Sequence, residues 1–301
     1  RLGQRPDFSM NRPEVHELLK DWRRLCDGYD EPRVLVGETW VCELERLAAF
    51  YGRDGDELHL AMNFVFILAR FDAARLAAIV ASSEAAIPPE AWPVWALSNH
   101  DLSRFPSRWA ADDPRLVRCL IMLLLALRGT PIIYYGDELG MPNTHVPPDR
   151  VRDHLPEGGS VAVSPPRDRS RTPMPWSPEP GGGFTDADVE PWLPFGDLAA
   201  TNVADQRQDP GSLLNLCRAM IALRRRHAEL RTGAYAQLAA PDGVWAFRRG
   251  AGTTVALNLC DRGARLTGVE GEIQVASDRA REGERLTGEL ELRPWEGMVA
   301  G

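Results

Sequence analysis

Two acidic residues follow short apolar runs of the kind that form buried strands. Glu38 comes directly after the run 33–37, and Asp101 comes shortly after the run Pro93–Leu97. In parallel α/β architectures, reactive groups collect at the carboxyl ends of the strands, where loops converge on one cavity. Two acids in one cavity suit glycoside hydrolysis, because one can protonate the departing oxygen while a negative charge stabilises an oxocarbenium-like transition state.

Each acid also has a structural interpretation, since a carboxylate at a strand end can cap a helix or pair with an arginine. A general acid needs an apolar, partly dry place in which it keeps its proton near neutral pH. His100, beside Asp101, is either a satisfied core histidine or a donor to a sugar hydroxyl. A metal site would need further ligands at suitable spacing, and none is visible, so we expect no metal.

Other residues could complete such a site. The segment Arg167–Arg171 (RDRSR) is either a solvated charged face or an arginine fork for a polar ligand, or for a carboxylate that holds the ligand. Trp40, Trp109 and Trp176 lie near these segments and are interpreted either as sugar-stacking walls or as ordinary packing. The pair Asp137–Glu138 ends another apolar run, and we expect it to have a structural role at the start of a long loop.

The elements that must position these residues alternate between helix and strand. Apolar residues at helical spacing predict helices, and short apolar runs predict buried strands. The helices are expected at 13–27, 43–51, 73–81 and 113–127, and the strand-like runs at 33–38, 59–66, 93–97 and 131–135. Four alternations predict βα units on a parallel sheet.

The second half of the chain differs in composition and in the pattern of its apolar residues. Residues 141–211 are rich in Pro, Gly, Asp and Arg, and a loop of this length in a compact protein is usually functional. A helix is predicted at 212–230. Short alternating stretches separated by Gly and Asp turns then predict a small all-β domain, with strands near 244–247, 253–259, 272–275 and 289–292.

The composition excludes several classes of protein. Of the 301 residues, 44% are hydrophobic and 26% are charged, which is typical of a globular protein and not of a disordered one. A net charge of −8 without a basic run argues against nucleic-acid binding, and no apolar run is long enough to span a membrane. Five scattered cysteines argue against a disulfide framework and for a reducing compartment, so we expect a cytoplasmic protein.

Four motifs occur in order along the chain. They are Val34 to Thr39 (VLVGET), Leu97 to Phe105 (LSNHDLSRF), Gly129 to Pro142 (GTPIIYYGDELGMP) and Arg171 to Trp176 (RTPMPW). Each motif alone is moderately specific. Together, in this order and spacing, they resemble glycoside hydrolase family 13, the α-amylase family, and most of all its α-glucosidase and oligo-1,6-glucosidase branch. The resemblance runs from about residue 5 to the end of the chain.

The resemblance implies an α/β fold, in which the C-terminal half of a (β/α)8 barrel with strands five to eight precedes a small all-β sandwich. It implies that Glu38 is the general acid/base and that Asp101 is the aspartate that stabilises the transition state. It also implies that either Arg167 or Arg171, with Arg167 favoured, meets the non-reducing glucose. The expected substrate-binding residues are His100, Arg167, Arg171, Asn99 and Trp40.

The sequence also departs from the family pattern. The family's nucleophile is an aspartate in a Gly-Phe-Arg-x-Asp type motif after the fourth strand, and Asp7 matches neither its spacing nor its preceding strand. The first-strand Asn-His motif and the domain after the third strand are also missing. We therefore expect a fragment with a barrel half over 1–232, a long eighth loop at about 141–211 and a β domain over 233–301. A retaining mechanism needs two carboxylates about 5–5.5 Å apart, one of which is the nucleophile. Because this nucleophile is missing, the fragment is expected to be inactive alone.

The expected function is therefore that of a retaining, α-glucosidase-like glycoside hydrolase. Its substrates would be α-linked glucosides, oligosaccharides or disaccharides of maltose or isomaltose type, with no cofactor and no nucleic-acid or membrane partner. One alternative keeps the fold but changes the reaction to transglycosylation or isomerisation, as in a trehalose synthase or a sucrose-active enzyme. Another is a non-catalytic carbohydrate-binding or partner protein, against which the presence of Glu38, His100 and Asp101 together speaks. The sequence leaves the linkage and the oligomeric state open.

Overall fold

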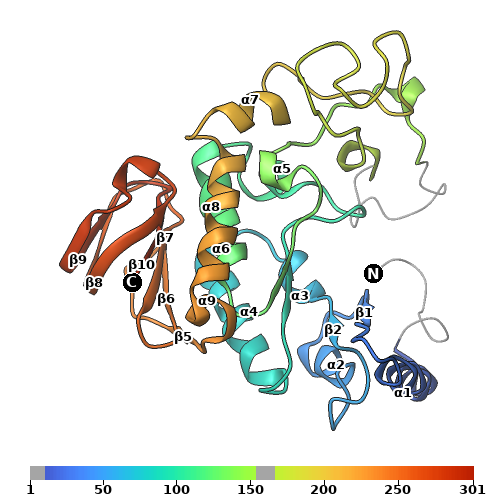
Figure 1. Ribbon diagram of the computed structural model, residues 1–301, viewed down its shortest axis with the longest axis vertical. Coiled ribbons are helices and arrows are strands. Elements are labelled where there is room, and N and C mark those ends of the chain that lie inside the picture. Colours follow the sequence, from blue (N-terminus) through green and yellow to red (C-terminus); the bar gives the residue numbers. More distant parts are fainter. Residues whose placement is uncertain (1–10, 154–166) are drawn as a thin grey trace. The chain divides into compact units, whose positions relative to one another are not determined.

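The computed structural model describes residues 11–153 and 167–301 (Figure 1). The chain divides into two compact units. Of the described residues, 11–96 and 127–132 form one unit, here called the parallel unit after its strands. Residues 97–126, 133–153 and 167–301 form the other, here called the antiparallel unit. Asp7 and the loop segment 154–166 lie outside the described residues.

The parallel unit contains four short strands that are paired in chain order. Strand β1 (Val36–Gly37) pairs in parallel with β2 (Leu60–Ala61), and β3 (Val94–Ala96) pairs in parallel with β4 (Thr130–Ile132). A single parallel bridge from Met62 to Val94 joins the two pairs. Consecutive strands that lie side by side and run in the same direction are the arrangement that successive βα units produce.

Four helices connect and flank these strands. They are α1 (Pro13–Asp27), α2 (Leu44–Ala49), α3 (Phe64–Ile67) and α4 (Ala73–Ala86). Helix α1 begins at a proline, whose missing N–H costs nothing in the first turn. Helix α4 begins after Asp72, whose side chain accepts the backbone N–H of Arg75 at 2.7 Å. A buried cluster that includes Leu19, Leu47 and Tyr51 joins α1 and α2 to the strands.

A close approach determines the residue that precedes Glu38. A Cβ atom added to Gly37 would lie 2.3 Å from Cδ1 of Leu58, well inside the van der Waals contact distance. Any larger residue would therefore force the Leu58 side chain to move, next to the position that presents Glu38.

The antiparallel unit starts with helices and ends in a six-stranded sheet (Figure 1). Its helices are α5 (Phe105–Trp109), α6 (Pro114–Ala126), α7 (Val203–Gln208), α8 (Leu213–Arg226) and α9 (Ala228–Thr232). Its strands are β5 (Tyr235–Gln237), β6 (Val244–Arg249), β7 (Thr253–Asn258), β8 (Ala264–Ala276), β9 (Arg285–Leu292) and β10 (Gly297–Ala300). All pairings are antiparallel, in the order β5-β6-β7-β10-β8-β9.

A buried arginine ties this sheet to helix α6. Arg249 is fully buried, and its Nη1 donates to the carbonyl of Ala126 at 2.5 Å, at the end of α6. Its Nε and Nη2 donate to the carbonyl of Gly233 at 3.2 and 3.1 Å. A cation is favourable at the last carbonyls of a helix, so Arg249 both satisfies these acceptors and fixes the sheet against the helix.

The predicted elements are mostly present, but α5, α7, β5 and β10 were not predicted, and α7 lies within the predicted loop 141–211. Two predicted elements also differ from their prediction. The apolar run 59–66 contains both strand β2 and helix α3 rather than one strand. The helix predicted at 212–230 is two helices, because His227 takes an extended conformation with φ −95° and ψ 113° between α8 and α9. Within residues 11–153 and 167–301, no helix has the length and apolarity needed to cross a lipid bilayer.

Candidate active site

The Asp101 loop, residues 97–104, follows strand β3 and leads into helix α5. The side-chain oxygen of Asn99 accepts the backbone N–H of Asp101 at 3.0 Å, and the Ser98 hydroxyl accepts the N–H of Phe105 at 2.9 Å. Asn99 and Ser98 are buried. Such local side-chain bonds replace the backbone partners that a strand or helix would supply, so they define the turn that presents the Asp101 carboxylate.

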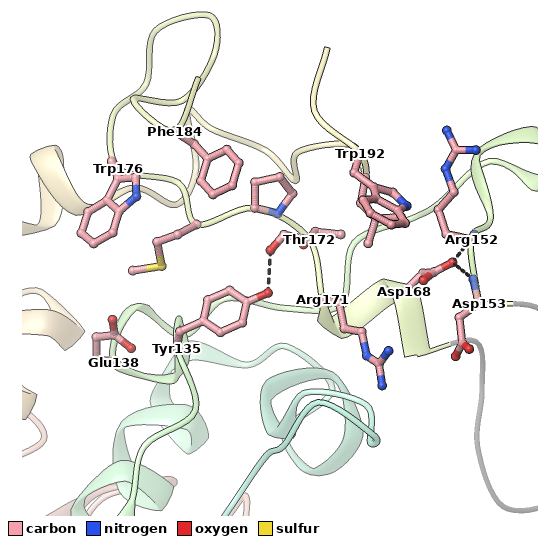
Figure 2. Close-up of a pocket in the computed structure, with 13 residues that line it drawn as sticks. Tyr135, Glu138, Arg152, Asp153, Asp168, Arg171, Thr172, Trp176, Phe184 and Trp192 are labelled. Carbon is pink, nitrogen blue, oxygen red and sulfur yellow. Dashed lines mark hydrogen bonds between the residues drawn. The ribbon is translucent and has the colours of Figure 1, made fainter. Parts of the chain in front are cut away.

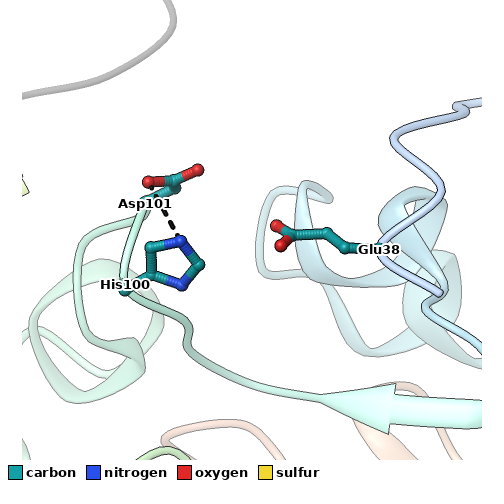
Figure 3. A group of neighbouring side chains, drawn as sticks. All are labelled: Glu38, His100 and Asp101. Atoms are coloured by element: carbon teal, nitrogen blue, oxygen red, sulfur yellow. Dashed lines mark ion pairs between the residues drawn. The ribbon is translucent and has the colours of Figure 1, made fainter. Parts of the chain in front are cut away.

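Three basic side chains approach the Asp101 carboxylate. Arg167 Nη1 and Arg171 Nη2 each donate to Oδ1 of Asp101 at 2.9 Å. His100 Nε2 lies 3.5 Å from the same oxygen (Figure 3). The Asp101 side chain is 28% exposed. Bonds between guanidinium and carboxylate are shorter and stronger than neutral ones, so this acid is held in one orientation while it still faces solvent.

Arg167 is itself fixed by a second carboxylate. Its Nε and Nη2 donate to the two oxygens of Asp153 at 2.5 and 2.7 Å, a bidentate pair. The hydrogen bonds from Arg167 lower the pKa of Asp153, and those to Asp153 and then Asp101 raise the pKa of Arg167. Arg167 therefore remains a cation that links two carboxylates.

The segment that carries these arginines is anchored by backbone contacts. Buried Asp168 accepts the N–H groups of Arg152 and Asp153 at 2.6 and 2.9 Å, which places the Asp153 carboxylate beside Arg167. Arg171 Nε donates to the carbonyl of His100 at 2.7 Å. The turn η3 (Arg167–Ser170) is thus joined to the Asp101 loop through backbone as well as side-chain atoms.

A cavity of about 700 Å³ lies beside this cluster in the antiparallel unit (Figure 2). Cavities of this size are typical of small-molecule sites. Arg171 and Asp153 line it, and so do three exposed aromatic residues. These are Trp176, Phe184 and Trp192, which are 48%, 54% and 74% exposed. The other lining residues are Tyr135, Glu138, Arg152, Asp168, Thr172, Pro173, Met174 and Leu193.

Two tyrosines that follow β4 donate hydrogen bonds to the segment that lines the cavity. The Tyr135 hydroxyl donates to the carbonyl of Thr172 at 2.8 Å, and the Tyr134 hydroxyl donates to that of Ser170 at 3.1 Å. Asp137 is fully buried, and its Oδ2 accepts the N–H of Tyr134 at 3.3 Å. Burial raises the pKa of Asp137 to about 7, although the nearby Arg104 cation lowers it.

The titration of Asp137 predicts a pH-dependent stability. Because the folded protein holds this proton up to about pH 7 and the unfolded chain only to about pH 4, the folded state binds more protons between these values. The free energy of unfolding should therefore fall as pH rises through this window, by about 4 kcal/mol from this group. Urea unfolding of Asp137→Asn should lack this slope. An unchanged slope in that variant, or its loss in the control Asp278→Asn at an exposed ion pair, would contradict the assignment.

Glu38 and Trp40 belong to the parallel unit. Glu38 directly follows β1 and is exposed, so the described residues do not supply the apolar surroundings expected of a general acid. Strand β1 is only two residues long, and Val36 within it is also exposed, at 54%. Trp40 has a positive φ of 36° and packs edge-on against Phe64, with ring centroids 4.5 Å apart.

The other tryptophans differ in their surroundings. Trp109 is 5% exposed and lies under the Arg108 guanidinium at 4.5 Å, so its place is that of ordinary packing. Trp176 lines the cavity. The absence of a metal, which we expect from the sequence, stays a prediction.

Several residues of the cluster were not expected from the sequence. Asp153 holds Arg167 through a bidentate pair, Asp168 holds the backbone of Asp153, and Phe184 and Trp192 line the cavity. Asp153 lies 14 positions before Arg167, and nothing in the spacing of an irregular loop distinguishes it from the other acids there. Phe184 and Trp192 carried a usable signal, since large aromatic residues are unusual in a segment so rich in Gly and Pro.

Comparison with known proteins identifies the family. Residues 3–233 match the family model described as "Alpha amylase, catalytic domain". The chain is 36% identical over 237 residues to a protein named probable alpha-glucosidase from Rhizobium meliloti, covering 75% of this chain and 41% of the relative. It is 31% identical to the trehalose-6-phosphate hydrolase of Escherichia coli, covering 80% of this chain and 49% of that enzyme.

A solved structure gives the same result. The crystal structure of an alpha-glucosyl transfer enzyme, XgtA, superposes with a TM-score of 0.83 and 31% identity, over 96% of this chain and 54% of that one. The chain thus spans about half the length of the relatives it matches. The likeness confirms the expected C-terminal half of a (β/α)8 barrel followed by an all-β domain. The chain belongs to glycoside hydrolase family 13, the α-amylase family.

Proposed function

We propose that the chain supplies the acid/base and the transition-state-stabilising carboxylate of a retaining glycosidase that acts on α-linked glucosides. Glu38 would protonate the glycosidic oxygen and later take a proton from water, and Asp101 would stabilise the positive charge that develops at the anomeric carbon. Substrates of maltose or isomaltose type are in keeping with a relative named probable alpha-glucosidase at 36% identity.

The observation that supports this proposal is that three basic side chains approach the Asp101 carboxylate. Arg167, Arg171 and His100 all approach Oδ1 of a carboxylate that is partly open to solvent. A purely structural ion pair would not need two guanidinium groups and an imidazole at one exposed acid. A preorganised, oriented charge is what an oxocarbenium-like transition state requires, because it costs no reorganisation during the reaction.

We assign the sugar contacts to the same cluster. Arg167 would donate to a hydroxyl of the non-reducing glucose, and Arg171 and His100 would contribute at the edge of the same ring. Buried Asn99 would act by holding the Asp101 backbone, through its 3.0 Å bond to that N–H. Trp40, two residues after Glu38, would contact the substrate next to the acid/base.

No Gly-Phe-Arg-x-Asp type motif occurs in the 301 residues. The nucleophile of a retaining mechanism would then come from outside these residues, and we expect the 301-residue chain alone to show no turnover. We also place the boundary between the barrel half and the β domain at 232/233. The end of α9 at Thr232 and the start of β5 at Tyr235 support that division.

We propose a cytoplasmic location for the protein. All five cysteines have free thiols, and two of them, Cys119 and Cys217, are buried among apolar residues. Burial raises the pKa of each of these two thiols to about 12, which keeps them unreactive as nucleophiles. Five unpaired thiols are typical of a reducing compartment.

The function can be tested with the product of the complete reading frame in which this chain lies. We expect it to release glucose from maltose or isomaltose, with glucose first appearing as the α-anomer, because a retaining mechanism keeps the configuration. Proton NMR of the fresh reaction distinguishes the anomers. Release of the β-anomer first would exclude a retaining mechanism, and no release from any α-glucoside would exclude a glycosidase.

Glucosyl transfer is a second candidate. The observation that favours it is the 31% identity to an enzyme named for alpha-glucosyl transfer, over 96% of the chain. Hydrolysis and transfer share the same first step and differ in whether water or a second sugar attacks next. The same NMR experiment separates them, since transfer gives new disaccharides or trisaccharides in place of stoichiometric free glucose.

A further inference from the structure

The Asp101 loop is bridged at both of its ends by one side chain. Arg108, in helix α5, donates through Nη2 to the carbonyl of Leu97 at 2.6 Å and through Nε to the carbonyl of Ser103 at 3.2 Å. Leu97 stands at the start of the loop and Ser103 near its end. A single guanidinium therefore spans the stretch that contains Asn99, His100 and Asp101.

The geometry of Arg108 restricts it to this role. Its guanidinium carbon lies 4.5 Å from the centroid of the buried Trp109 ring, so a cation–π contact also holds the group. Burial lowers the pKa of Arg108 to about 10, with Asp137 acting in the opposite direction, so the group stays charged at neutral pH. A planar fork fixed in this way can hold two carbonyls at a set separation, which a flexible ammonium group does less well.

The neighbouring Arg104 has a different task. It is fully buried, its Nη1 donates to the carbonyl of Tyr135 at 2.6 Å, and its guanidinium lies 4.9 and 4.7 Å from the Tyr134 and Tyr135 ring centroids. Gly136 leaves room for it, since a Cβ there would lie 2.9 Å from Nη1. Arg104 thus connects the Asp101 loop to the segment after β4. Arg108 instead connects the two ends of the loop to each other.

We propose that Arg108 is a positioning residue for the reaction, which closes the Asp101 loop and thereby sets where the Asp101 carboxylate stands. The proposal rests on the proposed function, because it takes Asp101 to be the acid that stabilises the transition state. Arg108 bonds to backbone carbonyls and would act only through the loop. Misplacing a catalytic group by about 1 Å can cost roughly 100-fold in rate, so a loosened loop should be visible in kcat.

The experiment compares Arg108→Lys and Arg108→Gln in the product of the complete reading frame. Lysine keeps the charge but loses the planar fork, and glutamine keeps a planar donor but loses the charge and one arm. We expect kcat to fall about 10- to 100-fold, least for the lysine variant, with KM changed by less than about threefold. The matched control is Arg115→Lys, because Arg115 is 61% exposed and pairs only with Asp113 among the described residues.

A second readout is independent of activity. Amide hydrogen exchange of the peptide covering residues 97–104 should become roughly tenfold faster in both Arg108 variants, while peptides of α6 keep the parent rate. Unchanged exchange in this peptide, or faster exchange with an unchanged kcat, would overturn the proposal. A parent enzyme that cleaves no α-glucoside would instead contradict the proposed function, and exchange alone would then decide whether Arg108 holds the loop.

Discussion

Asp101→Asn is expected to lower kcat/KM for an α-glucoside by roughly 100- to 1,000-fold or more. Asparagine has the same shape, but it carries no charge to balance the oxocarbenium-like transition state, and removal of one preorganised electrostatic group typically costs this much. The variant also leaves the Arg167 and Arg171 guanidiniums facing an amide instead of the carboxylate that they contact at 2.9 Å. Steady-state kinetics on an aryl α-glucoside, with the product of the complete reading frame, measures the effect.

The control for this variant is Asp278→Asn. Asp278 also pairs with an arginine, Arg293, but in the β domain, so it reports the cost of losing an ion pair without losing the site. We expect its kcat/KM to stay within about twofold of the parent, because an exposed pair contributes at most about 1 kcal/mol to stability. Equal activity of Asp101→Asn and the parent would show that Asp101 is an ordinary strand-end carboxylate paired with arginine.

The sequence was sufficient to place Asp101 and its immediate neighbours. A short apolar run at 93–97 predicted a buried strand with Asp101 shortly after its end, and the structure has β3 followed by the turn that contains Asp101. The fork interpretation of Arg167–Arg171 included an arginine that holds a carboxylate, and both terminal arginines of that segment contact Asp101. Patterns of this kind are readable because strand periodicity and turn chemistry are local.

The partners within the long loop could not be predicted in the same way. The Asp153–Arg167 pair and the bonds from Asp168 to backbone N–H groups depend on how an irregular segment folds back on itself. No periodicity or turn signal encodes such contacts, and several acids in that loop were equivalent in sequence. Only the folded arrangement shows which of them faces Arg167.

A local irregularity in strand β8 makes this strand hard to recognise from the sequence. Its pairing with β9 shifts register between Thr267 and Val269, where Gly268 has a φ of 76°. Buried Leu266 and Val269 are therefore three positions apart, so the alternation with a period of two that marks a strand is interrupted. The sequence accordingly predicted only the end of this strand, near 272–275, and its first half was missed.

Glu38→Gln should separate the acid/base role from a merely structural one by its dependence on the leaving group. Glutamine neither gives nor takes a proton, so kcat/KM for a disaccharide should fall by roughly 100- to 10,000-fold. An aryl glucoside with an acidic phenol needs little protonation to depart, so its kcat/KM should fall far less. The matched control is Glu291→Gln, an exposed glutamate that pairs with Arg265 in the β domain.

The ratio of the two losses in kcat/KM, for the disaccharide and for the aryl glucoside, distinguishes the two possible roles of Glu38. If Glu38 only stabilised the fold near β1, both substrates would lose activity equally, since a misfolded site does not distinguish leaving groups. If Glu38 is the acid, the disaccharide loses far more kcat/KM than the aryl glucoside, and the alkaline arm of its pH–rate profile should disappear with the carboxyl group. Because Glu38 is exposed in the described residues, such a result would also show that the apolar surroundings of a general acid come from outside them.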